Sequence, residues 1–286
     1  MRCLVFGGTG ILGRALAREQ RRRGESILAL SQEQADLEDA AAVARWIDVF
    51  RPEAVINCAA WTRVDDCESN PDLAFRVNGR AVSHAARAAQ AAGVAFVQVS
   101  TDYVFDGRAN SPYSEDATPS PLSVYGASKL EGERQALAGH PRALVVRTSW
   151  LFGEGGPNFV DTILGILRRG ERRLRVVGDQ FGGPTHAPAL ARAILDLLER
   201  RASGIVHYRG RDAVSWADFA RAIVDERAPD AQVETVTTAE FPRPAPRPAF
   251  SVLAVGRAEQ LLGRRVEPWR QGLWEHLEFD RQHRRH

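Results

Sequence analysis

Short apolar runs alternate with helical patterns through the first half of the chain. The runs are CLVFGG, SILALS, AVINCAA, VAFVQVS and ALVVRTSW, which begin at residues 3, 26, 54, 94 and 143. Stretches with helical periodicity lie between them, at 13–24, 37–50, 72–93 and 123–139. Strands that are apolar without alternation are buried on both faces, and strands that alternate with helices form parallel sheets. The pattern therefore predicts a parallel sheet covered by helices on both faces.

Crossover connections between parallel strands are right-handed, and this handedness produces a doubly wound α/β sheet of the Rossmann type. Such a sheet binds its ligand at the carboxyl ends of the strands. We predict a dinucleotide-binding domain of this class over residues 1–150, with residues 186–210 returning to it.

The regular alternation of apolar runs and helical patterns ends at about residue 150. Helices are predicted over 158–170, 187–201 and 215–228, and the proline-rich FPRPAPRPAF at 241–250 is predicted to be an extended connector. We interpret residues 151–286 as a smaller substrate-binding domain. Trp216, in the last of these helices, is predicted to pack in the core or at an interface.

Composition and charge narrow the class of protein. The formal net charge is only +2, and we interpret arginine clusters such as REQRRRG at 18–24 as solvated helix faces rather than a nucleic-acid surface. The three cysteines form no CxxC pair, and the seven histidines show no metal-ligand spacing. No apolar run approaches the ~18–20 residues that cross a bilayer, and the first strand begins at residue 2, which leaves no room for a signal peptide. We expect a soluble cytoplasmic protein with no metal, nucleic-acid or membrane partner.

The glycine-rich sequence GGTGILG directly follows the first predicted strand and opens a helix. Gly7, Gly10 and Gly13 have the spacing that lets a backbone turn sharply and approach a pyrophosphate at a helix N-terminus. The alternative is a turn with a purely structural role. Because of its place between a strand and a helix, we predict dinucleotide binding.

The end of the second predicted strand bears on which dinucleotide is bound. Proteins selective for NAD place an acidic residue there, about 20 residues after the glycines, to hold the ribose 2′-hydroxyl. This chain has Ser31 instead, so a 2′-phosphate would not be repelled, and we predict that NADPH is accepted at least as well as NADH. Asp36 follows, and either caps the next helix or contacts the adenine.

Lys129 is the only lysine among 38 lysines and arginines, and it lies one helical turn after Tyr125 in SVYGASKLEGE. An ammonium near a phenol favours the phenolate, so we predict that Lys129 lowers the pKa of Tyr125 toward the range of acid–base catalysis. Lysine can also reach a ribose hydroxyl with a compact charge, which the planar fork of arginine does not reproduce. Thr101, at the end of the fourth strand, is predicted to hydrogen-bond a substrate carbonyl. The alternatives are a surface lysine beside an incidental tyrosine, and a threonine that satisfies loop backbone.

These motifs together resemble the extended short-chain dehydrogenase/reductases, and within them the dTDP-4-dehydrorhamnose reductase family. The Tyr-x-x-x-Lys pair is typical of the superfamily, whereas STDYVFDG, RTSWLFG and DQFGGPT are more specific. The resemblance extends over most of the chain. It implies reduction of the C4 ketone of a nucleotide-activated 6-deoxy-hexulose, dTDP-4-dehydro-L-rhamnose, by NADPH or NADH.

The resemblance also implies residue roles. Tyr125 is the proton donor and Lys129 holds the nicotinamide ribose, while Thr101 orients the sugar and Asp102 and Trp150 line its pocket. The remaining cofactor contacts are Gly10, Ile11 and Leu12 at the pyrophosphate, Asp36 and Leu37 at the adenine, and Ala60, Trp61, Thr62 and Val99 along the rest of the cofactor.

Several departures and alternatives stay open. Ala254 and Arg257 replace an acid and a lysine of the family pattern in the region expected at the nucleotide, and Ala189 lacks the acid through which some relatives bind magnesium. A sugar-nucleotide epimerase or dehydratase shares the fold, but related dehydratases read Thr-Asp-Glu where this chain has Thr101-Asp102-Tyr103. A non-catalytic NADP-binding regulatory subunit also resembles the family. The sequence leaves homodimer formation undecided.

Arg243 and Arg247, in the proline-rich stretch, either reach the substrate diphosphate or are solvated linker charges.

Overall fold

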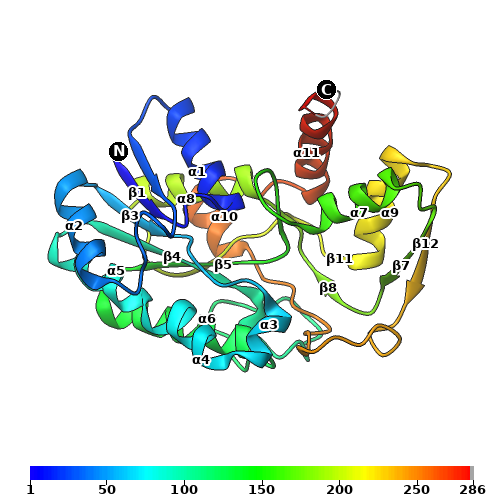
Figure 1. Cartoon of the computed structure of the whole chain (residues 1–286), viewed down its shortest axis with the longest axis horizontal. Helices are drawn as coiled ribbons and strands as arrows, with labels where there is room; N and C mark the ends of the chain where they lie inside the picture. Colours follow the sequence, from blue (N-terminus) through cyan, green and yellow to red (C-terminus); the bar gives the residue numbers. More distant parts are fainter. Residues whose placement is uncertain (284–286) are drawn as a thin grey trace.

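The computed structural model describes residues 1–283 and is built around a six-stranded parallel sheet (Figure 1). Its strand order is β10-β5-β4-β3-β1-β2, so the chain winds outward in both directions from β1 and the order reverses between β1 and β3. The strands are β1 (Cys3–Phe6), β2 (Ile27–Leu30), β3 (Ala54–Asn57), β4 (Ala95–Thr101), β5 (Leu144–Thr148) and β10 (Gly204–His207). The predicted doubly wound α/β class is confirmed.

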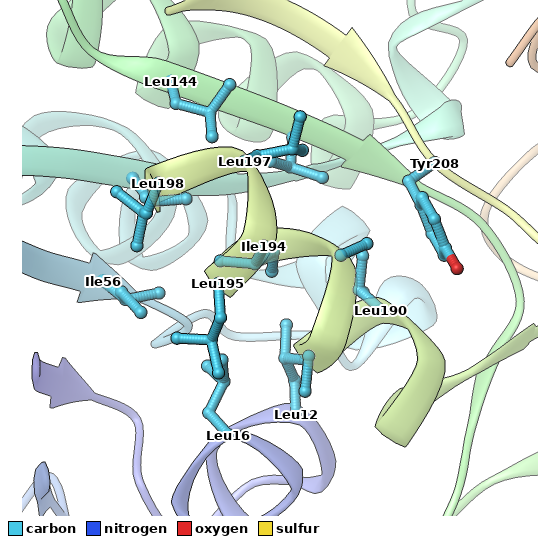
Figure 2. Packing of buried hydrophobic residues seen from close by; sticks show 14 of the residues in the cluster. Leu12, Leu16, Ile56, Leu144, Leu190, Ile194, Leu195, Leu197, Leu198 and Tyr208 are labelled. Carbon is cyan, nitrogen blue, oxygen red and sulfur yellow. The ribbon is translucent and has the colours of Figure 1, made fainter. Parts of the chain in front are cut away.

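Helices cover both faces of this sheet. One face carries α1 (Ile11–Arg22), α8 (Ala187–Glu199) and α10 (Gly256–Leu262), and the other carries α2 (Ala40–Phe50), α5 (Val82–Ala91) and α6 (Val124–Gly139). Alternate strand residues serve alternate faces: Cys3 and Val5 pack toward α1 and α8, whereas Leu4 and Phe6 pack toward α2 and α5. Figure 2 shows the first of these cores, in which leucines of α1 and α8 interdigitate over β3 and β5. Full burial on both faces explains why these strands lack alternation.

The second half of the chain contributes to this sheet as well as to a smaller lobe. Strand β10 pairs with β5, and α8 packs on α1, so residues from 187 to 207 complete the sheet and one of its covering layers.

The smaller lobe has its own apolar core, built around Phe152, Phe219, Trp269 and Leu273. Its helices are α7 (Phe159–Arg168), α9 (Trp216–Arg227) and α11 (Trp269–His283). Its strands form short pairs: β6 (Leu151–Phe152) with β9 (Thr185–His186), β7 (Arg173–Val177) with β12 (Gln232–Val236), and β8 (Phe181–Gly182) with β11 (Val214–Ser215). This lobe lies beside the β5 side of the sheet (Figure 1).

Residues 241–254, which we call the return segment, lead from the smaller lobe back to the sheet. Residues 241–249 form neither helix nor strand, and the backbone bends at 241, 244, 245 and 249, so this connector is irregular rather than fully extended. The segment then runs beside the loop after β4, where Phe250 N donates to Gly107 O and Tyr113 N donates to Val252 O. Gly107 has φ +73°, and a Cβ there would lie 2.5 Å from Pro248 Cβ, so glycine permits this close crossing.

Candidate active site

The carboxyl ends of β1, β3 and β4 bring the predicted cofactor residues to one edge of the sheet. Phe6 is in register with Asn57, and Asn57 with Gln98, so Gly7, Cys58 and Val99 come next to one another where the strands end. Gly7 has φ +78°, and a Cβ there would lie 2.6 Å from Ala59 N. This edge lies at the point where strand order reverses, which is where doubly wound sheets bind their ligands.

The glycine loop leaves an open approach to the start of α1. A Cβ at Gly13 would lie 2.4 Å from Gly7 O, so Gly7 and Gly13 allow the loop to close on itself. A Cβ at Gly10 would meet only Gly7 O, at 3.4 Å, so the outer side of Gly10 is open to a ligand. Gly8, which the sequence analysis did not single out, is also required, because a Cβ there would lie 2.6 Å from the carbonyl carbon of Ala29.

Ile11 and Leu12 present backbone rather than side-chain chemistry. Helix α1 begins at Ile11, has no side-chain cap, and makes its first backbone bond from Arg14 N to Gly10 O. The amides before Arg14 therefore lack intrahelical carbonyl partners and are suited to an anion. The Leu12 side chain is buried in the core, and the Ile11 side chain packs near Gly156 of the smaller lobe.

The residues after β2 differ from one of our alternatives. Asp39, not Asp36, caps α2, by accepting hydrogen bonds from Ala41 N and Ala42 N, each at 3.0 Å. Asp36 accepts from Glu38 N in the turn before the helix, so the interpretation of Asp36 as the helix cap is wrong. The helix starts later than its apolar pattern predicts, and Leu37 packs in the core ahead of it. An adenine contact by Asp36 and Leu37 stays a prediction.

The loop Ala60–Thr62 follows β3 and is fixed by Asn78. Trp61 N donates to Asn78 Oδ1 at 2.7 Å, and Asn78 Nδ2 donates to Trp61 O at 3.0 Å and to Ser128 Oγ at 3.1 Å. Asn78 is fully buried in a π-helical turn, Phe75–Arg80, between α4 (Pro71–Ala74) and α5. Asn78 was not among the predicted site residues, although a lone asparagine in an alanine-rich helical pattern is a visible signal.

Thr101, Tyr125 and Lys129 converge at the end of β4, and all three are buried. Ser123 caps α6 by accepting from Gly126 N, so the first turn of the helix presents Tyr125 and the next turn presents Lys129 on the same side. Lys129 Nζ donates to Val99 O at 2.7 Å, and the Thr101 hydroxyl lies beside the Tyr125 phenol. The structure thus brings together the three predicted catalytic residues and Val99.

The charge states in this group differ from our prediction. Burial raises the pKa of Tyr125 well above its usual value, and the neighbouring Thr101 hydroxyl opposes this only in part. Burial lowers the pKa of Lys129 to about 8, and the nearby Glu133 carboxylate acts in the opposite direction. The prediction that Lys129 lowers the Tyr125 pKa is wrong for this arrangement, because desolvation of the phenol dominates and Lys129 Nζ is directed to Val99 O. A phenol that keeps its proton is suited to act as an acid.

A buried ion pair lies behind Lys129. Glu133 Oε1 accepts from Arg147 Nε at 2.8 Å and from Ser100 Oγ at 2.6 Å, and Glu133 Oε2 accepts from Arg147 Nη2 at 2.7 Å. Burial and the Arg147 charge lower the pKa of His207 to about 3, so the imidazole beside Arg147 is neutral. This ion pair could not be predicted from local sequence, because its partners lie on separate elements, α6 and β5.

Asp102 faces the return segment rather than open solvent. Burial raises the pKa of its carboxyl to about 7, against hydrogen bonds from Ser251 and Thr101. Ser251 Oγ donates to Asp102 Oδ2, and Thr101 Oγ1 donates to Asp102 Oδ1 at 3.1 Å. Ser251, which we did not predict, ties the return segment to the residue that follows Thr101.

The return segment is held a second time by Asp65, in α3 (Val64–Ser69). The Asp65 carboxylate accepts from Arg243 Nη2 at 2.7 Å, Arg247 Nη1 at 3.0 Å and Ala245 N at 3.1 Å. The Arg247 side chain is mostly buried, which excludes a solvated linker charge at that position.

Trp150 lies on the far side of the site, between the sheet and the smaller lobe. It follows β5, and its indole stacks on Trp216 of α9, with ring centroids 3.5 Å apart. In the part of the chain that the structure describes, no group of three or more His, Cys, Asp or Glu side chains is placed to hold a metal ion. None of the helices between residues 1 and 283 has the length and hydropathy of a membrane span.

Comparisons with known proteins agree on one family. A model described as the RmlD substrate binding domain matches residues 1–281. The dTDP-4-dehydrorhamnose reductase of Aggregatibacter actinomycetemcomitans is 40% identical, over 95% of this chain and 97% of that protein. The spore coat polysaccharide biosynthesis protein SpsK of Bacillus subtilis is 38% identical, over 96% of each chain.

Solved structures give the same result. The dTDP-4-dehydrorhamnose reductase of Clostridium acetobutylicum has a TM-score of 0.93 and 37% identity, covering 98% of this chain and 100% of that one. The Bacillus anthracis reductase, solved in complex with NADP, has a TM-score of 0.93 and 33% identity, covering 97% and 99%.

Proposed function

The chain belongs to the RmlD substrate-binding-domain family, and we propose that it is an NADPH-dependent reductase of a nucleotide-activated 4-keto-6-deoxy sugar. We infer that the substrate is dTDP-4-dehydro-L-rhamnose and the product dTDP-L-rhamnose, because relatives over nearly the full length carry the name dTDP-4-dehydrorhamnose reductase. The observation that carries the proposal is the buried convergence of Thr101, Tyr125 and Lys129 at the end of β4.

The residues at the sheet edge are suited to a nicotinamide dinucleotide. The uncapped amides at the start of α1 and the open side of Gly10 would take the pyrophosphate, and Lys129 would hold the nicotinamide ribose. Ser31 at the end of β2 carries no negative charge that would repel a 2′-phosphate, which favours NADPH. When bound, the cofactor supplies a hydride to the C4 carbon of the sugar.

The protein's part in the reaction is to orient the ketone and to supply a proton. Tyr125 is protonated at neutral pH, and it would donate that proton to the C4 oxygen as the carbon gains the hydride. The ketone thus becomes a secondary alcohol. The Thr101 hydroxyl, which lies beside Tyr125, would turn its proton from Asp102 to the same oxygen and so direct that oxygen toward the phenol. The Lys129 ammonium, directed to Val99 O, is left to hold the cofactor ribose rather than to act on the phenol.

The smaller lobe and the return segment would hold the substrate. We assign Trp150 and Asp102 to the sugar, as the family resemblance implies. Arg247 lies beside Asp65 and Tyr103, so its guanidinium is available to exchange Asp65 for a substrate diphosphate, which pairs with arginine in the same bidentate manner. We place the activity in the cytoplasm, where the three free cysteines would stay reduced.

A direct assay separates this function from its alternatives. The purified protein is mixed with dTDP-4-dehydro-L-rhamnose and NADPH, and NADPH oxidation is compared with the amount of dTDP-L-rhamnose formed. A reductase oxidises one NADPH for each dTDP-L-rhamnose that it forms. Conversion of the sugar without net NADPH oxidation would indicate an epimerase or dehydratase, and NADPH binding without conversion would indicate a regulatory subunit.

Tyr125→Phe provides the matched control. We expect it to lower kcat by at least about 100-fold, the usual contribution of a positioned acid, while the affinity for NADPH stays within about twofold. A regulatory subunit has no turnover to lose, and its affinity for NADPH would stay unchanged. The residue after Asp102 also favours net reduction, because Tyr103 stands where related dehydratases have a second acid.

A further inference from the structure

Trp150 has a backbone conformation that large side chains rarely adopt. Its φ is +47°, in the left-handed region. Residues held in such regions persist only where the surrounding structure fixes them, and they gather at functional sites. The contacts around Trp150 therefore show what holds it.

Two segments of the smaller lobe fix the Trp150 indole. The Trp216 ring stacks on it nearly parallel, with centroids 3.5 Å apart and an interplanar angle of 6°. The backbone of Gly182 lies so close that a Cβ there would be 2.4 Å from Trp150 Cε2. Thr185 N donates to Trp150 O at 3.2 Å, which fixes the backbone of the same residue.

The same strand pair positions both neighbours of the indole. Strands β8 and β11 pair antiparallel with Val214 opposite Gly182. Trp216 follows two residues after Val214 and therefore lies beside the Gly182 backbone. Trp216 opens α9 directly after its cap Ser215, and Phe159 of α7 packs against its ring at 4.6 Å. The orientation of Trp150 is thus set by the smaller lobe, although Trp150 itself belongs to the end of β5.

We propose that Trp216 is a positioning residue for the sugar half of the substrate. By stacking on Trp150 it fixes the indole that the hexose meets, and so it sets the affinity for the sugar without touching the nucleotide or the cofactor. The proposal deepens the function given above and rests on the assignment of Trp150 to the sugar pocket. Aromatic pairs prefer defined offset or edge geometries, so losing one ring lets the other reorient.

The test compares ligands that differ only in the sugar. Binding of dTDP-L-rhamnose and of dTDP is measured by titration calorimetry on the full chain and its Trp216→Ala and Trp216→Phe variants. The control is Trp274→Phe, an exposed tryptophan on α11. We expect Trp216→Ala to weaken dTDP-L-rhamnose binding about tenfold, which corresponds to ~1.4 kcal/mol, with dTDP and NADPH binding unchanged. Trp216→Phe should recover most of the loss, and the control should behave as the parent protein.

A spectroscopic measurement reports the ring pair independently of binding. Stacked indoles give an exciton-coupled circular dichroism signal, which should be present in the parent protein and in Trp274→Phe and absent in both Trp216 variants. The proposal is overturned if the parent protein lacks this signal, or if Trp216→Ala loses it and still binds dTDP-L-rhamnose normally. It is equally overturned if dTDP and NADPH binding fall by the same factor, since the change would then be one of folding.

The outcome is separable from the proposed reaction. If the protein binds dTDP-L-rhamnose more tightly than dTDP but oxidises no NADPH, the reductase assignment fails while the role of Trp216 survives. If Trp150→Ala leaves dTDP-L-rhamnose binding intact, the assignment of Trp150 to the sugar is wrong and the inference falls with it.

Discussion

The Glu133–Arg147 ion pair predicts a large effect for Glu133→Gln. Both side chains are nearly inaccessible, at 3% exposure for Glu133 and 1% for Arg147, and the substitution leaves the guanidinium buried without its counter-charge. Removing one partner of a buried pair costs about 3–5 kcal/mol. At roughly 2–4 °C per kcal/mol for chains near this length, Tm should fall by about 10 °C.

The same substitution should also change the pH dependence of the reaction. The Lys129 pKa is about 8, and the Glu133 charge holds it up against desolvation. Without that charge the ammonium loses its proton at lower pH, so the alkaline fall in kcat/KM should move to lower pH. The profile measured from pH 6 to 9 under NADPH saturation checks this.

Two further variants test whether the loss of stability comes from the unpaired buried charge. Glu133→Gln combined with Arg147→Met removes both charges and should recover most of the lost unfolding free energy, measured by urea denaturation. Glu131→Gln, on the same helix but with a partly exposed carboxylate, should cost less than ~1 kcal/mol. If Glu133→Gln stays within ~1 kcal/mol of the parent protein, or if the double variant is no better than the single one, the reasoning about the buried pair is refuted.

Three further predictions follow from individual contacts. The Asp102 pKa is raised to about 7, so its protonated form stabilises the fold fully below about pH 4, and this stability is lost as the pH rises through 7. Asp102→Asn should therefore flatten the decline of unfolding free energy with pH in urea titrations. An unchanged dependence on pH would contradict the raised Asp102 pKa. Asn78→Ala leaves Trp61 N–H and C=O without their partner, which should weaken NADPH binding about tenfold in a fluorescence titration. An unaltered Kd would show that these two hydrogen bonds do not support cofactor binding. Gly13→Ala places a Cβ 2.4 Å from Gly7 O, so calorimetry should detect no NADPH binding, and retained affinity would mean that the loop tolerates the shift.

Much of the fold follows from local sequence. Apolar runs without alternation predict the buried parallel strands, because a strand that is buried on both faces has no solvent-facing positions for polar residues. The glycine spacing and the Tyr125–Lys129 pair are also local, since a tight turn and one helical turn fix their geometry. These parts of the site can be predicted from sequence because the residues that form them are close together in the chain.

The parts that were missed depend on distant partners. Arg243 and Arg247 bond Asp65 across 178 and 182 residues, and no local pattern indicates which carboxylate an arginine will find. The Trp150–Trp216 stack likewise joins separate segments. The effect of Lys129 on Tyr125 was misjudged for another reason: sequence shows neighbouring charges, whereas the pKa of the phenol depends mainly on how deeply it is buried.

The interleaving of the two lobes has a consequence for how the protein is made. Strand β5 ends at Thr148, but its outer neighbour β10 begins only at Gly204, and the helix that covers Leu12 and Leu16 ends at Glu199. On a ribosome adding roughly 5–20 residues each second, the nascent sheet waits several seconds with a bare edge and an uncovered apolar face. We expect a fragment cut at residue 150 to stay in that unfinished state, so dividing the gene there should not yield the cofactor half as a stable protein.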